Sequence, residues 1–238
     1  MTAPSATAVN EKSARVLPTR SGTLARFWSS SIGKKAVMAV TGLIMIAFLI
    51  AHVLGNLQVF AGPLKINEYS AALHRLGPLL WLARGGLIVA LVLHVIAAYQ
   101  LTQRKRTARP IGYADADPQV STFASRTIRW GGVLLLVFIV LHLLHLTFGT
   151  IHPAFDRKDV YGNMIVAFQV WWVALLYLLA MIGVGLHLYH GTWSSIRTLG
   201  LTRASANPLK RRATALLVWA IYLGFSIIPI AVLAGIVR

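Results

Sequence analysis

The chain has 238 residues, of which 57% are hydrophobic and 12% are charged, whereas a soluble domain carries about 25% charged residues. This deficit excludes an ordinary soluble protein and predicts a surface that largely faces lipid. The net charge of +17 would indicate nucleic acid binding in a soluble protein, but the basic residues stand in short segments between apolar runs. We therefore expect the lipid bilayer, and no nucleic acid, as a partner. Without cysteine, this chain cannot hold a thiolate-bound iron–sulfur cluster.

Residues 1–30 are polar and basic, and we expect a cytoplasmic arm with an interfacial segment near 24–28. Five apolar runs then reach the roughly 20 residues that a helix needs to cross a bilayer. They cover residues 36–57, 79–101, 130–148, 165–196 and 213–237. Because continuous apolar runs satisfy their backbone groups in lipid as helices, residues 31–238 are predicted to form an all-α integral membrane protein with five transmembrane helices.

Lys and Arg are distributed unevenly between the two sides of this predicted bundle. The N-terminal arm and the connections after the second and fourth runs carry 17 of them, and the other side carries six. The positive-inside rule therefore places the N-terminus in the cytoplasm and the C-terminus outside, in the cell inner membrane. The connections at 58–78 and 149–164 are expected to fold over the outer face.

Six histidines lie within the apolar runs, where a polar side chain is costly and indicates a functional site. His94 and His187 each precede an arginine of the inner side by ten residues, which is about 15 Å of helix. His52 stands ten residues before Gly62, and His142 stands ten residues before His152, in the two outer connections. The spacing thus predicts an inner pair and an outer pair of histidines at matched depths.

Two depth-matched pairs suit two b-type haems, each with its iron between imidazoles of two helices. Iron with two axial histidines has no open position, and such a centre carries electrons. Packing histidines, a zinc site and a proton relay remain as alternatives. Spacing alone also leaves open the choice between His142 and His145 and between His187 and His190, because residues three apart share one helix face. The sequence predicts a haem-binding helical bundle.

Four segments surround these histidines: FLIAHVLGN at His52, LVLHVIAAY at His94, LVFIVLHLLHLT at His142 and HLYHGTWSSIRTLG from His187. In these segments, and over about residues 30–235, the chain resembles the single-chain, five-helix, di-haem cytochrome b anchor of succinate:quinone oxidoreductases, that is, of succinate dehydrogenase and fumarate reductase. The last segment is the most specific, because the family has its fourth ligand six residues before a Trp–Ser pair, here Trp193 and Ser194.

The resemblance implies the ligands, the cofactors and the partners. It selects the first histidine of each close pair, so that His52 and His142 hold the outer haem iron and His94 and His187 hold the inner one. It implies two haem b, an iron–sulfur subunit on the cytoplasmic face and a flavoprotein subunit bound through it, with FAD and iron–sulfur clusters only in those subunits. Electrons from succinate would reach quinone, expected to be menaquinone, in the respiratory chain. This chain alone would not oxidise succinate, and a higher oligomer is compatible with this role.

Secondary sites follow from depth. Haem propionates at the inner surface need donors, and the arginines among the candidates also fit ordinary topology charges. These candidates are Ser31, Arg126, Arg129, Trp130, Ser194 and Arg197. A quinone headgroup needs polar partners beside an apolar slot. Its candidates on the outer side are Tyr69, His74, Arg75 and Arg84, with His145 and His152 approaching from the other outer connection. The alternative is an inner site lined by Ser29, Ser31 and Lys34.

One position departs from the pattern of the family. Some members carry an acid two residues before the fourth ligand, where this chain has Gly185, and no Asp or Glu lies in a spanning run. A carboxylate proton relay is therefore not expected. Gly183 and Gly185 are instead expected to leave space for the haem beside His187. Alternative functions are a cytochrome b subunit of another quinone-linked enzyme, such as a formate dehydrogenase or hydrogenase, and a histidine-relay proton-coupled transporter.

Overall fold

The computed structural model describes residues 22–108, 122–202 and 208–238, and every regular element in these ranges is a helix. The elements are α1 (Thr23–Ser29), α2 (Ser31–Asn56), the 3₁₀-helix η1 (Leu57–Ala61), α3 (Pro63–Arg75), α4 (Pro78–Thr107), α5 (Phe123–His142), the π-helix η2 (Leu143–Thr147), α6 (Val160–Gln169), α7 (Trp171–Thr198) and α8 (Pro208–Leu233). The all-α prediction is confirmed. Most of the predicted arm, residues 1–21, lies outside the described residues.

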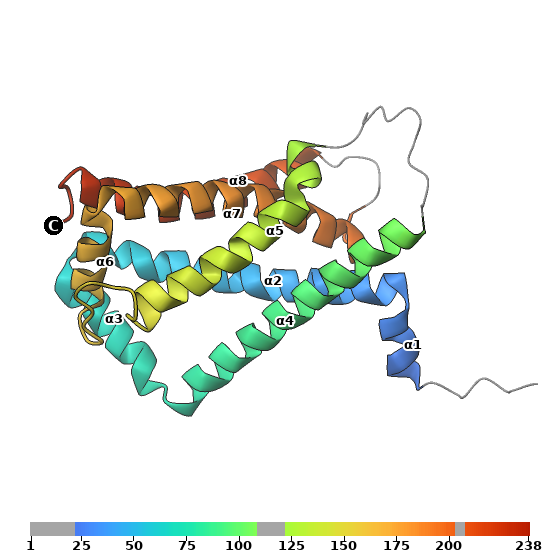
Figure 1. Cartoon of the computed structure of the whole chain (residues 1–238), viewed down its shortest axis with the longest axis horizontal. Helices are drawn as coiled ribbons and strands as arrows, with labels where there is room; N and C mark the ends of the chain where they lie inside the picture. Colours follow the sequence, from blue (N-terminus) through green and yellow to red (C-terminus); the bar gives the residue numbers. More distant parts are fainter. Residues whose placement is uncertain (1–21, 109–121, 203–207) are drawn as a thin grey trace, which may run out of the picture.

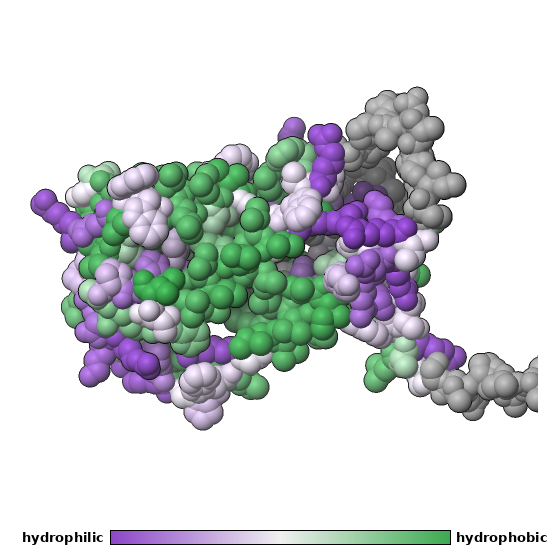
Figure 2. All heavy atoms as spheres, viewed as in Figure 1, coloured by the Kyte–Doolittle hydropathy of each residue, from purple (hydrophilic) through white to green (hydrophobic). Residues whose placement is uncertain are grey.

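Five helical stretches are long and apolar enough to cross a membrane, as predicted. They are Ser31–Ala61, Pro78–Thr107, Phe123–Thr147, Trp171–Thr198 and Pro208–Leu233. Helix α1 lies at one end of the molecule, and α3 and α6 lie at the other (Figure 1). We call these the α1 end and the α3–α6 end. Figure 2 shows hydrophobic atoms across the middle of the visible face and hydrophilic atoms gathered toward both ends, as expected for a bilayer-spanning protein.

The helices begin where the sequence offers caps. Ser30 accepts a hydrogen bond from the amide of Gly33 at 2.8 Å at the start of α2, and Thr122 accepts one from Ser125 at 3.2 Å at the start of α5. These bonds satisfy amide groups that have no partner within the helix. Three further helices start with proline, which has no N–H to satisfy. They are Pro63 of α3, Pro78 of α4 and Pro208 of α8.

The fourth apolar run is not one helix, which corrects our prediction for 165–196. Val170 is extended, with φ −81° and ψ 103°, and separates α6 from α7. Helix α6 is tied to α3 by Asn67, whose amide donates to Asp159 at 2.9 Å and whose oxygen accepts from the amide N–H of Tyr161 at 3.1 Å. Hydropathy missed this break, because a helix buried in a protein core is as apolar as one that faces lipid.

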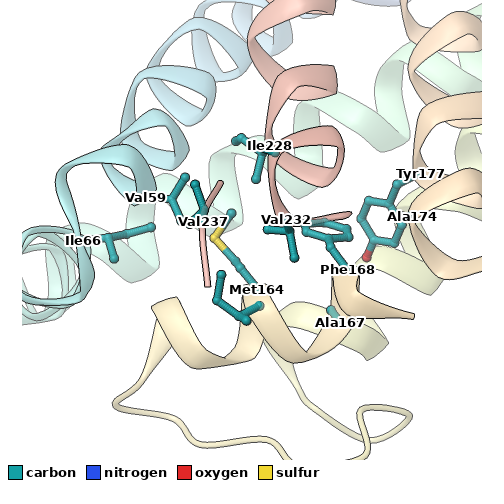
Figure 3. Packing of buried hydrophobic residues seen from close by; sticks show 12 residues of the cluster. Val59, Ile66, Met164, Ala167, Phe168, Ala174, Tyr177, Ile228, Val232 and Val237 are labelled. Carbon is teal, nitrogen blue, oxygen red and sulfur yellow. The ribbon is translucent and has the colours of Figure 1, made fainter. Parts of the chain in front are cut away.

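The main buried core lies at the α3–α6 end, where α6 packs among η1, α3, α7 and α8. Figure 3 shows Phe168 of α6 beside Val232 of α8, and Met164 of α6 reaching toward Val237. A smaller cluster joins α2, α7 and α8 further along the bundle. This packing holds α2, α7 and α8 together through close-packed side chains.

Helices α4 and α5 flank this packed half. Among the described residues, α4 packs extensively only against α2, and α5 among the long helices only against α7. The buried residues of α4 are Ala90 and Ala97, and that of α5 is Ala124. The two helices are therefore held mainly from one side, and both carry histidines that face inward.

Candidate functional site

Two histidine pairs join neighbouring helices inside the bundle. His52 of α2 faces His142 at the end of α5, with 5.9 Å between ring centres and 80° between ring planes. His94 of α4 faces His187 of α7, with 6.3 Å between ring centres and 55° between ring planes. The structure thus brings together the same side chains that the depth estimate pairs. In each pair the two helices are not consecutive spans.

The two pairs lie at different depths. The ring of His94 lies against Gly42 of α2, where an added Cβ would be 3.3 Å from His94 Cε1. The ring of His187 lies against Gly132 of α5, where an added Cβ would be 3.7 Å from His187 Cε1. On both α2 and α5, the histidine of the other pair follows ten residues after this glycine. Ten residues of helix measure about 15 Å. Both α2 and α5 therefore place the two histidine pairs about 15 Å apart along the bundle.

The spacing of the rings fits one metal ion between each pair. A metal–imidazole bond is about 2.1 Å long and the nitrogen lies about 1.1 Å from its ring centre, so two rings on one metal have centres about 6.4 Å apart. The observed 5.9 Å and 6.3 Å lie close to this value. Among the described residues, no group of three or more His, Cys, Asp or Glu side chains is placed to hold a metal ion. Each histidine pair offers two imidazoles, which is the donor set of iron in a haem with two axial histidines.

Helix α2 holds the ring of His94 in an orientation suited to metal binding. His94 Nδ1 lies 3.1 Å from the carbonyl oxygen of Met38 and 3.3 Å from Thr41 Oγ1. A carbonyl oxygen only accepts, so Nδ1 carries the proton and donates it. The other nitrogen, Nε2, then keeps a free lone pair for a metal. This support could not be predicted, because a backbone carbonyl leaves no signal in the residue pattern.

The ring of His187 is held differently from that of His94. Its Nδ1 is buried and has no hydrogen-bond partner among the described residues, which is costly for a polar atom. Gly183 and Gly185, which we expect to leave space for a haem beside His187, lie close to side chains of neighbouring helices. An added Cβ on Gly183 would contact Leu135 at 3.5 Å, and one on Gly185 would contact Tyr222 at 3.7 Å. Of the three glycines, Gly132 is the one whose missing side chain makes room for the ring of His187.

The structure separates His142 from His145. His145 is buried, and its Nδ1 lies 3.0 Å from the hydroxyl of Tyr177, which is also 3.5 Å from His142 Nδ1. The ring of His145 stacks near that of His152, with 5.2 Å between centres. His145 lies in η2, whose wider π-helical turn breaks the i,i+3 relation to His142. His145 is therefore directed toward Tyr177 and His152, and His142 is the histidine that faces His52.

The structure also distinguishes His187 from His190. His190 Nε2 lies 3.3 Å from Ser194 Oγ on the next turn of α7, and His187 is the member that faces His94. His52 lies between aromatic rings, with Phe48 stacked at 5.2 Å. Its Nε2 accepts a hydrogen bond from Asn56 at 3.3 Å, a long bond that a metal at Nε2 would replace.

The predicted propionate candidates lie at the α1 end, mostly on the surface. Ser31 is exposed and accepts a hydrogen bond from Arg104 at 3.1 Å. Ser194 interacts with His190. The other four are exposed, namely Arg126, Arg129, Trp130 and Arg197. Their exposure agrees with the alternative reading of the arginines as topology charges, which solvent screens.

The predicted quinone candidates do not form one cluster. The ring of Tyr69 lies against Gly55, where an added Cβ would be 2.7 Å from Tyr69 Cε1. Gly55 follows His52 by three residues, so Tyr69 lies near the His52–His142 pair. His74 and Arg75 are exposed at the end of α3, and Arg84 lies over the ring of Trp81 on its own helix at 5.1 Å. For the alternative inner site, Lys34 is buried and donates to the carbonyl of Trp28.

The fold defines a multi-pass helical membrane protein that contains two interhelical histidine pairs. Comparisons of the chain with protein-family models, with curated proteins and with solved structures gave no match. The particular function is therefore inferred from the residues and their geometry.

Proposed function

We propose that the chain is the membrane anchor and cytochrome b subunit of a succinate:quinone oxidoreductase and binds two b haems. The observation that supports haem binding best is the pair of interhelical histidine contacts, with ring centres 5.9 Å and 6.3 Å apart and about 15 Å between the two depths. Two interhelical histidine pairs at two depths are the arrangement that two haems, each with two axial imidazoles, would need.

The residues have distinct roles in this proposal. His52 and His142 would hold one haem iron near the α3–α6 end, and His94 and His187 would hold the other nearer the α1 end. The Met38 carbonyl and Thr41 keep Nε2 of His94 unprotonated. When bound, the haems would supply one-electron carriers at two depths, between an iron–sulfur subunit on the cytoplasmic α1 end and quinone.

The assignment to succinate rests on the resemblance in sequence. The segments around the four histidines, and above all the Trp–Ser pair six residues after His187, are those that resemble the succinate:quinone oxidoreductase anchors. The quinone is proposed to be menaquinone and to bind at the α3–α6 end. Tyr69 is the candidate for a hydrogen bond to its headgroup, because its ring lies against Gly55, one helical turn from His52.

Haem binding is tested on the purified full-length chain. The dithionite-reduced spectrum should show a b-type α-band with two haems per chain. H52A and H142A should each lose one haem, H94A and H187A should each lose the other, and H145A and H190A should keep both because their rings face elsewhere. A preparation without porphyrin, or with one haem per chain, would contradict the proposal.

The partner assignment needs a separate experiment. A tagged chain isolated from its native membrane should bring with it an iron–sulfur subunit and a flavoprotein, and the complex should couple succinate oxidation to quinone reduction. If the complex instead contains subunits of a formate dehydrogenase or hydrogenase, the assignment as a cytochrome stands and the assignment to succinate is wrong.

A further inference from the structure

A groove of about 280 Å³ lies at the α1 end between α7 and the start of α8. It is lined by Tyr189, Pro208, Arg211, Arg212 and Ala215. Arg211 donates from Nε to the hydroxyl of Tyr189 at 3.3 Å, so one guanidinium is oriented across the groove. Both arginines are exposed, and none of the described residues that line the groove is acidic.

This groove is separate from the histidine pairs. Tyr189 follows His187 by two residues, which places the two side chains about 200° apart around α7. Tyr189 packs beside the cluster that contains Val218 and Ile221 of α8, whereas His187 faces His94 of α4. A ligand in the groove would therefore lie on the opposite side of α7 from a haem at His187.

The charges in the groove favour an anion. Helix α8 has no acidic residue in its first turn, and Arg211 and Arg212 lie within its first two turns. The N-terminus of a helix carries a partial positive charge, so these cations oppose the helix dipole. An anion between them would interact favourably with both guanidinium groups and with the dipole.

An exposed apolar stripe continues from the groove along α8. Leu216, Trp219 and Leu223 follow Arg212 at helical spacing and are 70%, 58% and 56% exposed. Positions four, seven and eleven residues further along a helix lie on the same face. Because α8 is a membrane span, this stripe descends from the basic groove into the hydrocarbon region.

We propose that the groove binds the phosphate of an anionic phospholipid, with an acyl chain along Leu216, Trp219 and Leu223. Basic pockets between transmembrane helices at a membrane surface recognise such headgroups. Free phosphate would use the arginines but not the stripe. A soluble acidic protein would leave the stripe uncovered, because the stripe lies below the membrane surface.

Delipidated full-length protein in neutral detergent tests the proposal by native mass spectrometry and by thermal stability. Phosphatidylglycerol should bind and raise the melting temperature, whereas phosphatidylcholine of the same chains, and inorganic phosphate at equal concentration, should not. R211Q/R212Q should weaken phosphatidylglycerol binding about 10-fold to 30-fold, and Y189F should weaken it less. The matched control is K105Q/R106Q, which removes the same charge from exposed positions at the α1 end of α4 and should change binding less than twofold.

Several outcomes would overturn the proposal. Equal binding of phosphatidylcholine excludes headgroup recognition, and this comparison uses the unaltered protein, so it holds even if the double variant does not fold. Stabilisation by inorganic phosphate alone indicates a free-anion site. If R211Q/R212Q binds lipid normally but loses a soluble partner subunit, the groove is a protein interface.

Discussion

At the residue scale, the position of a histidine ring is determined as much by the neighbouring helix as by its own. His94 is oriented by the carbonyl of Met38 and by Thr41, and the small size of Gly42 allows the ring to approach α2. The pairing of histidines could be predicted from sequence, because helical rise converts residue counts into depth. The supporting contacts could not, because a main-chain oxygen and a close approach depend on how helices pack.

Gly42→Ala tests the close approach. The added methyl would lie 3.3 Å from His94 Cε1, so the ring must shift by a few tenths of an ångström. We expect the haem at His94 and His187 to bind less tightly or to show a changed midpoint potential, with the other haem unaffected. A redox titration with haem quantification measures both. Gly85→Ala is the control, because nothing lies within 4 Å of an added methyl there, and an equal effect in both variants would contradict the argument.

At the element scale, one polar side chain fastens α3 to α6 at the end of the bundle. The residue pattern predicts connections that cover this end, but it does not predict that Val160–Gln169 is a separate helix. The tie through Asn67 joins residues more than 90 positions apart in the chain, a separation at which local sequence pattern carries no information. The effect of the π-helix η2 could not be predicted for a related reason. It directs His145 toward Tyr177, which lies on another helix.

Asn67→Ala should loosen this end of the molecule. The change removes both hydrogen bonds to the start of α6 and leaves Asp159 and the Tyr161 amide without that partner, at a cost of about 1–3 kcal/mol. We expect a lower melting temperature and faster proteolysis in residues 149–159, with histidine-bound haem retained. Asn67→Asp keeps an acceptor for the Tyr161 amide but adds a charge facing Asp159, so it should not restore stability. An unchanged melting temperature in Asn67→Ala would show that the tie contributes nothing.

At the scale of the whole molecule, the bundle is asymmetric. Helices α2, α7 and α8 share buried cores, whereas α4 and α5 each pack extensively against one long helix. Each flanking helix also supplies one member of a histidine pair. Bound haem would thus connect α4 to α7 and α5 to α2, contacts that side chains alone provide only weakly.

Removal of haem should therefore affect the flanking helices most. We expect faster amide hydrogen exchange in α4 and α5 of haem-depleted protein, with less change in α8, because most buried apolar residues of α8 lie in the two hydrophobic clusters. Mass spectrometry of the exchanged protein in detergent, with and without haem, measures this. Uniform acceleration over all spans would instead indicate general unfolding.

The order of spans in each histidine pair also bears on how the protein is made. The ribosome releases α2 first and α7 late, so His52 can meet its partner once α5 has entered the bilayer, while His94 must wait for α7. A nascent chain that ends before α6 would then already contain both histidines of one proposed haem site. Cofactor insertion during synthesis would proceed from the α3–α6 end toward the α1 end.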